Sequence, residues 1–229
     1  RSDERSHAGI PPLTRYHSDM GPARRAVIGF VLIAAVVAGV SEQRLRSDVD
    51  ELGKRLVGIA SEAAGQLDGA VHETIRSEAD ADSIGFVRLR DTLRRVQDAH
   101  HHLLQGADIY TLRSVGDDRA CAFVVMTNPS AFVGAPYTCI SAADSVWDGA
   151  RAHTGIYRSP SGVWVSGFAP LLGADDSVVA MVEVDRAADD LVGNRLRNLL
   201  IALILGLFGG GVLGLLPGRL SFVEGPRKA

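Results

Sequence analysis

The sequence predicts an α+β protein with long N-terminal helices followed by an antiparallel sheet, plus two transmembrane helices. Three observations support this. Two apolar blocks without charge lie near the ends of the 229-residue chain. Between them, apolar residues first recur every three or four positions, which is helical spacing. From Gly106 onward they occur in short runs separated by turn residues, which is typical of strands. Helices followed by strands indicate the α+β class.

Composition narrows the range of functions. The chain is 46% hydrophobic and 22% charged, with a formal net charge of −3 and a mean hydropathy of +0.11. This charge argues against a nucleic-acid-binding protein that relies on a strong positive field. The excess of apolar residues argues against a plain cytosolic enzyme and favours a membrane-anchored protein. The lipid bilayer is therefore an expected partner, and nucleic acid is not.

The second apolar block predicts a transmembrane helix over residues 199–218. It has 20 residues and no charge, enough to cross a hydrocarbon core of roughly 30 Å. Glycines recur at every fourth position and so share one face of the helix: Gly206, Gly210, Gly214 and Gly218. Such a face allows a second helix to approach closely. We expect a membrane-protein partner or a second copy of the chain there; the alternative is that glycine is simply common in membrane helices.

The first block, Ala26 to Val40, is shorter. We expect an uncleaved transmembrane helix over residues 26–41, because Arg24 and Arg25 can extend the usable span by snorkelling. The alternative is a signal peptide cleaved after Val36-Val37-Ala38.

The flanking charges predict the orientation. The tails at residues 1–25 and 219–229 are short and basic, which is typical of the cytoplasmic side. Residues 42–198 are then expected outside an inner (cytoplasmic) membrane that the chain crosses twice, as a periplasmic or extracellular domain. Within that domain we expect helices over 42–105 and a sheet over 106–187.

The helical region begins with an apolar stripe from Leu45 to Ile75, which predicts one helix of about thirty residues continuing from the first span. A polar turn follows, with Ser83 as a possible N-cap. A second helix is expected from Phe86 to Leu104.

The expected strands are 109–112, 120–126, 163–168 and 178–184, joined in hairpin order. A short helix is expected over 142–152. Another begins at Asp189 and leads into the second span.

These elements resemble the Cache family of PAS-like extracytoplasmic sensor domains. The resemblance rests on Tyr110-Thr111-Leu112, on Gly155-Ile156-Tyr157, on the run from Gly162 to Leu171, and on the closing run from Val178 to Asp185. It covers roughly residues 41–195. It implies a PAS-like sheet outside the membrane that binds a small molecule or only packs against a neighbour.

Aromatic and cationic residues of the sheet region are candidates for ligand binding: Arg119, Tyr137, Arg151, Tyr157 and Trp164. Such groups suit a ligand that carries a carboxylate or a ring. The alternative is that Tyr157 and Trp164 only pack the sheet. Asp185 is expected either to bind an amine or to cap the next helix.

No residue pattern predicts catalysis. Cys121 and Cys139 are the only cysteines and are expected either to form a disulfide or to remain buried thiols. Three consecutive histidines, His100 to His102, point about 100° apart on a helix and cannot chelate one metal ion. We therefore expect no metal, no cofactor and no enzymatic activity.

Only residues 219–229 follow the second span, and they hold no output module. Two interpretations follow. The chain is either the sensory part of a longer signalling receptor, or an accessory structural subunit that stabilises a larger photosynthetic, respiratory or transport complex. The sequence names no ligand for either.

Overall fold

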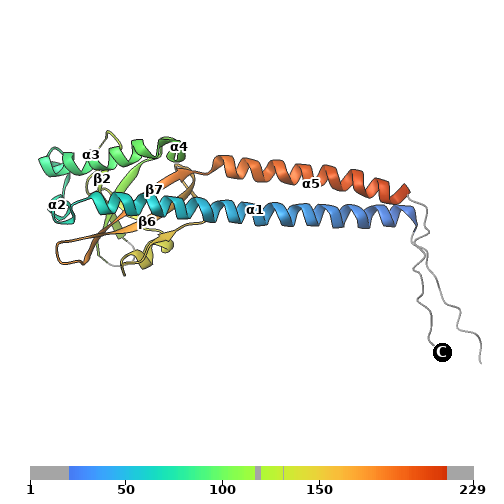
Figure 1. Ribbon diagram of the computed structural model, residues 1–229, viewed down its shortest axis with the longest axis horizontal. Coiled ribbons are helices and arrows are strands. Elements are labelled where there is room, and N and C mark those ends of the chain that lie inside the picture. Colours follow the sequence, from blue (N-terminus) through green and yellow to red (C-terminus); the bar gives the residue numbers. More distant parts are fainter. Residues whose placement is uncertain (1–20, 117–119, 131, 216–229) are drawn as a thin grey trace, which may run out of the picture. The chain divides into compact units, whose positions relative to one another are not determined.

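The computed structural model describes residues 21–116, 120–130 and 132–215 (Figure 1). The described part of the chain divides into two compact units, one with residues 21–38 and 199–215 and the other with the described residues between 39 and 198. Two long helices belong partly to each unit: α1 (Pro22–Gln66) and α5 (Asp189–Leu215). Both are long and apolar enough to cross a membrane. As expected, α1 continues from the first apolar block into the second unit without a break.

In the first unit, glycines of α5 face α1. A β-carbon placed on Gly210 would lie 2.5 Å from the carbonyl oxygen of Ala26, and one on Gly206 would lie 2.8 Å from the ring of Phe30. Gly209, which the every-fourth-residue pattern omits, lies against Ile33 in the same way. The face with Gly206 and Gly210 is thus occupied by the chain's own first span. The surroundings of Gly214 and Gly218 lie outside what the structure describes.

The helical part of the second unit differs from expectation at one point. The stripe from Leu45 to Ile75 is not one helix, because α1 ends at Gln66 and a separate α2 spans Gly69–Thr74. Asp68 starts the new helix, since its carboxylate accepts a hydrogen bond from the backbone N–H of Val71 at 3.1 Å.

The second helical segment begins where the sequence predicted, but it is divided into two helices. After the 3₁₀ turn η1 (Glu78–Asp80), α3 spans Ile84–Ala99 and α4 spans His101–Leu104. The hydroxyl of Ser83 accepts from the N–H of Phe86, so the expected N-cap is confirmed. The single helix expected from Phe86 to Leu104 is interrupted at His100, whose backbone is not helical.

In the described part of the chain, the sheet has seven antiparallel strands: β1 (Ile109–Ser114), β2 (Ala120–Met126), β3 (Pro136–Thr138), β4 (Ala152–His153), β5 (Tyr157–Ser159), β6 (Gly162–Leu172) and β7 (Val178–Ala187). The 3₁₀ helix η2 (Ser141–Val146) stands where a longer helix was expected over 142–152. Strands β3, β4 and β5 were not expected; each has three residues or fewer, too short for a periodic signal.

The strand order is β3-β2-β1-β7-β6-β4, with β5 paired to β6. The expected hairpin order is therefore wrong at the centre, where the first strand pairs with the last. In this pairing Tyr110 lies opposite Glu183, and Ile109 lies opposite Val184. The β1–β7 pairing brings side chains of both strands to one place on the sheet.

The two faces of the sheet have different cores. One face packs against α1 and α3 through Leu56, Phe86 and Val182, among other buried apolar residues. The approach of α1 is close, since a β-carbon on Gly167 of β6 would lie 2.5 Å from the backbone of Leu56. The opposite face carries a smaller cluster that includes Tyr110, Phe168 and Met181. The α+β class with an antiparallel sheet is confirmed.

Candidate functional site

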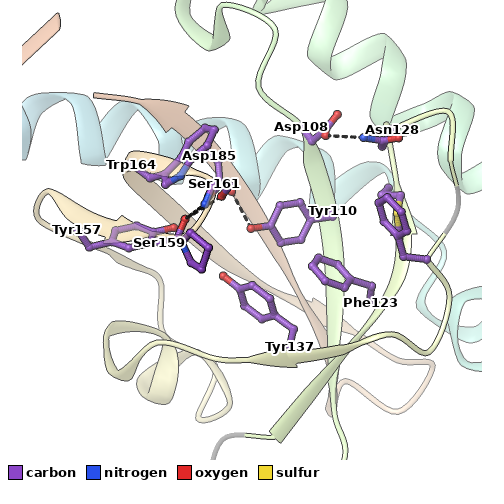
Figure 2. Close-up of a pocket in the computed structure, with 13 residues that line it drawn as sticks. Asp108, Tyr110, Phe123, Asn128, Tyr137, Tyr157, Ser159, Ser161, Trp164 and Asp185 are labelled. Carbon is purple, nitrogen blue, oxygen red and sulfur yellow. Dashed lines mark hydrogen bonds between the residues drawn. The ribbon is translucent and has the colours of Figure 1, made fainter. Parts of the chain in front are cut away.

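A cavity of about 430 Å³ opens on the face of the sheet that carries the smaller cluster (Figure 2). Six aromatic side chains line it: Tyr110, Phe123, Phe132, Tyr137, Tyr157 and Trp164. The rings of Tyr110 and Tyr137 each meet that of Phe123 edge to face, with centroids 5.1 Å apart in both pairs. An aromatic cavity with a few polar groups is the usual form of a small-molecule site.

The last strand supplies carboxylates to this region. Asp185 lines the cavity and accepts hydrogen bonds from Tyr110 at 2.7 Å and from Ser166 at 2.5 Å. Glu183 precedes it by two residues on β7, so both side chains emerge on the same face of the strand. Glu183 is fully buried; Oε1 accepts from Tyr137 at 3.2 Å, and Oε2 has no partner among the described residues.

A third carboxylate lies elsewhere on the wall of the cavity. Asp108 comes just before β1 and accepts from the hydroxyl of Thr127 at 3.0 Å and from the side-chain amide of Asn128 at 3.2 Å. Figure 2 shows Asp108 and Asn128 on one side of Tyr110, and Asp185 and Trp164 on the other. Polar groups are thus present at two places on a largely aromatic wall.

Burial changes the ionisation of these groups. It raises the pKa of Glu183 well above its usual range, and the nearby charge of Asp185 raises it further. Burial also raises the pKa of Asp185, although hydrogen bonds from Ser166 and Tyr110 oppose the shift. The pKa values of Tyr110, Tyr137 and Tyr157 are raised mainly by burial, so these phenols stay protonated as hydrogen-bond donors. The pair Glu183 and Asp185 therefore retains a proton more readily than free carboxylates do.

The structure brings together four of the six predicted ligand-binding residues, namely Tyr137, Tyr157, Trp164 and Asp185. Arg151 is not among them: it lies in a separate groove with Ser61 and Leu172. Arg119 lies outside the described residues. Asp185 does not cap α5, because it belongs to β7 and its oxygens face Tyr110 and Ser166.

Sequence reasoning missed Tyr110, Phe123, Asp108, Asn128 and Glu183. A signal for Glu183 was present, because this residue interrupts an apolar strand. Burying a carboxylate in a hydrophobic core costs free energy, so a carboxylate at such a position indicates a special role. Tyr110 and Asp108 carried no such signal. They reach the cavity only because β1 pairs with β7.

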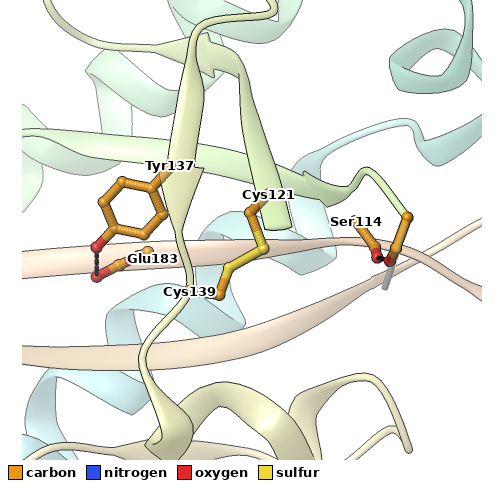
Figure 3. Close-up of a disulfide and its surroundings, with 6 residues drawn as sticks. Ser114, Cys121, Tyr137, Cys139 and Glu183 are labelled. Atoms are coloured by element: carbon orange, nitrogen blue, oxygen red, sulfur yellow. Dashed lines mark hydrogen bonds between the residues drawn. A yellow bond between two sulfur atoms is a disulfide. The ribbon is translucent and has the colours of Figure 1, made fainter. Parts of the chain in front are cut away.

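A disulfide joins Cys121 of β2 to Cys139, one residue after β3 (Figure 3). Both cysteines are buried in the smaller cluster. The disulfide ties β3 to β2 close to Tyr137, whose hydroxyl reaches Glu183. It therefore helps to fix one aromatic wall of the cavity.

The histidine triplet is placed on the surface of the second unit. His100 lies 2.8 Å from a carboxylate oxygen of Glu62, and the rings of His101 and His102 contact each other. Among the described residues, no group of three or more His, Cys, Asp and Glu side chains is arranged to hold a metal ion.

Comparison with solved structures finds sensor domains. The chain is similar to the sensor domain of Escherichia coli DcuS (TM-score 0.43, 13% identity, 65% of this chain and 96% of that one). It is also similar to the periplasmic sensory domain of the Campylobacter jejuni chemoreceptor Tlp1 (TM-score 0.42, 9% identity, 69% of this chain and 62% of that one). A third similar structure is the ligand-binding domain of the C. jejuni chemoreceptor Tlp3 in complex with L-valine (TM-score 0.36, 11% identity, 82% of this chain and 68% of that one).

The likeness to sensor domains agrees with the resemblance that the sequence predicted. No protein-family model and no curated protein sequence matches the chain.

Proposed function

We propose that the chain is a membrane-anchored, extracytoplasmic, non-catalytic sensor domain that binds a small molecule in the aromatic cavity. Two helices suited to crossing a membrane support the anchoring. The basic flanks of these helices support an outward-facing domain.

One observation carries the proposal: a wall of the cavity is formed by the strand that leads into a membrane helix. Asp185 lines the cavity on β7, which ends at Ala187, and α5 begins at Asp189. Arg186 also joins the strand to the helix through a two-point ion pair with Asp190, at 2.8 and 2.9 Å. A ligand that moves Asp185 therefore acts on a segment that is rigidly attached to the start of α5.

The test is a ligand screen on the full chain in lipid nanodiscs, read out as a change in melting temperature. A compound that binds the cavity is expected to stabilise the wild type and to bind at least fivefold more weakly to Phe132→Ala. Val115→Ala is the matched control, because Val115 is also an exposed apolar residue (51%, against 46% for Phe132) and lies outside the cavity.

Two results would contradict the proposal. One is that no compound stabilises the wild type; the other is that every stabilising compound acts equally on Phe132→Ala. Either result, together with purification in fixed stoichiometry with a large membrane complex, would favour the alternative of an accessory structural subunit.

A further inference from the structure

The cavity is lined by carboxyl groups, and its described lining holds no positive group. Asp108 and Asp185 line it, and the described lining contains no lysine, arginine or histidine. Arg151, a predicted cationic contact, lies in the other groove. The expected match to a ligand carboxylate therefore has no support in the charges of this wall.

Among the residues that the structure describes, these carboxylates have only neutral donors as hydrogen-bond partners. Asp185 accepts from two hydroxyls, Asp108 from a hydroxyl and an amide, and Glu183 from one phenol. Hydrogen bonds of this kind satisfy lone pairs but do not neutralise the charge. Glu183 is buried, and Asp108 and Asp185 are half-buried. A carboxylate that is withdrawn from water without a counter-charge is costly, so the site favours a ligand that brings positive charge.

The aromatic wall suits the same kind of ligand. The faces of tyrosine, phenylalanine and tryptophan rings attract a cation that lies within about 6 Å of the ring centre. Six such rings surround the cavity. The combination of rings and carboxylates attracts a cation that also has apolar surface.

A metal ion fits this wall poorly. Hard cations such as Ca²⁺ need about six to eight oxygen ligands and Mg²⁺ needs octahedral geometry, whereas aromatic carbon makes up most of this lining. The described residues also contain no cluster of acidic or histidine side chains suited to a metal. An organic ammonium group needs no such coordination shell.

We infer that the aromatic cavity binds a small organic cation of the alkylammonium class, held between its aromatic rings and the carboxylates of Asp108 and Asp185. This inference rests on the proposed function, because it names the ligand class of the same cavity.

The test compares compounds of similar shape that differ in charge. Three sets are used: choline with 3,3-dimethylbutan-1-ol and 3,3-dimethylbutanoate, benzylamine with benzyl alcohol and benzoate, and putrescine with butane-1,4-diol and succinate. Binding to the full chain in nanodiscs is measured at pH 7.5 by calorimetry. It is also measured by fluorescence of Trp147→Phe, in which Trp164 is the only tryptophan left.

In at least one set the cation is expected to bind ten times more tightly than its neutral and anionic counterparts. Asp185→Asn is expected to weaken that binding at least tenfold, and Asp108→Asn to weaken it severalfold. Asp148→Asn is the control, because Asp148 is an exposed aspartate outside the cavity. The melting temperature of each variant shows whether it is folded, and Asp108→Asn tests the inference independently if Asp185→Asn is not.

The inference and the proposed function fail differently. If no cation exceeds its counterparts, while a neutral or anionic compound from these sets or the screen binds and is weakened by Phe132→Ala, the inference is overturned and the proposed function stands. If nothing binds in the cavity, both are overturned.

Discussion

The phenol of Tyr110 donates a hydrogen bond of 2.7 Å to Oδ2 of Asp185, across 75 residues of sequence. Tyr110 lies directly opposite Glu183 in the ladder between β1 and β7, so its hydroxyl reaches diagonally to the next residue on the same face of β7. This one side chain therefore links the first strand, the last strand and the aromatic cavity.

Replacing Tyr110 with phenylalanine removes this donor and leaves Asp185 with the hydroxyl of Ser166 alone. A hydrogen bond to a charged or partly charged group contributes about 1.5–3 kcal/mol, and we expect a loss of that order in the free energy of unfolding. Urea denaturation of the full chain in detergent, followed by circular dichroism, measures it. Tyr157→Phe is the control variant, because the hydroxyl of Tyr157 contacts the neutral hydroxyl of Ser166 and not a carboxylate. Equal losses in the two variants would contradict the special role of Tyr110.

Glu183 makes the stability of the protein depend on pH. Its pKa is raised in the folded state by burial and by Asp185, so the folded chain holds a proton that the unfolded chain releases. The free energy of unfolding then falls as pH rises above the ordinary pKa of a glutamate, by up to about 1.4 kcal/mol per pH unit. Asp185, Tyr110, Tyr137 and Tyr157 face the same region, and none of them supplies positive charge.

We therefore expect Glu183→Gln to melt at a higher temperature than the wild type, with a difference that grows from pH 5 to pH 8. Glu78→Gln is the control, since Glu78 is exposed. A difference that stays constant over this range would refute the buried, protonated carboxyl pair.

His72 has the opposite pH dependence. Its Nε2 lies 2.8 Å from the hydroxyl of Thr111, and burial lowers its pKa to about 4, with a further contribution from Arg113. The unfolded chain takes up a proton near pH 6.5 while the folded chain does not, so stability is lost as pH falls from about 6.5 to 4. The full loss is about 3 kcal/mol. His72→Gln is expected to flatten this part of the curve; a variant that loses stability with acid as steeply as the wild type would show that His72 is not responsible.

The glycine contacts between α1 and α5 predict that a leucine at position 210 lowers stability, whereas a leucine at the neighbouring position 211 does not. Leucine at position 210 would place atoms against the carbonyl of Ala26, whereas a β-carbon on Gly211 meets nothing within 4 Å. We expect Gly210→Leu to separate the two helices and to lower stability by about 1–3 kcal/mol. Gly211→Leu should have little effect. Disulfide trapping between cysteines introduced at positions 33 and 209, where a β-carbon on Gly209 would meet the side chain of Ile33, measures the separation. Equal trapping in both variants would contradict the packing.

The sequence predicted elements whose signals are local. The bounds of β2, the N-cap at Ser83 and the continuation of the first span into a long helix follow from periodicity and capping chemistry. The break at Asp68 was missed because apolar spacing continues on both sides of it.

The cavity was predicted only where its residues stand out by type. Tyr137, Tyr157, Trp164 and Asp185 were found, whereas Asp108 and Tyr110 were not, because their place depends on which strand lies beside β1. Periodicity shows that a segment is a strand but carries no information on its partner. The lack of a positive group in the described lining was also missed, because it depends on Arg151 lying in another groove.

The central position of β7 also affects how the protein is made. Strands β1 and β6 are both hydrogen-bonded to β7 and not to each other, so two separate hairpin regions stay unjoined until the last strand arrives. Pairings between distant parts of a chain form slowly. During synthesis, the partly built domain therefore exposes two unpaired inner edges until residue 187 emerges. A chain shortened before Val178 loses the middle of its sheet, and we expect it to be a substrate for proteases and chaperones.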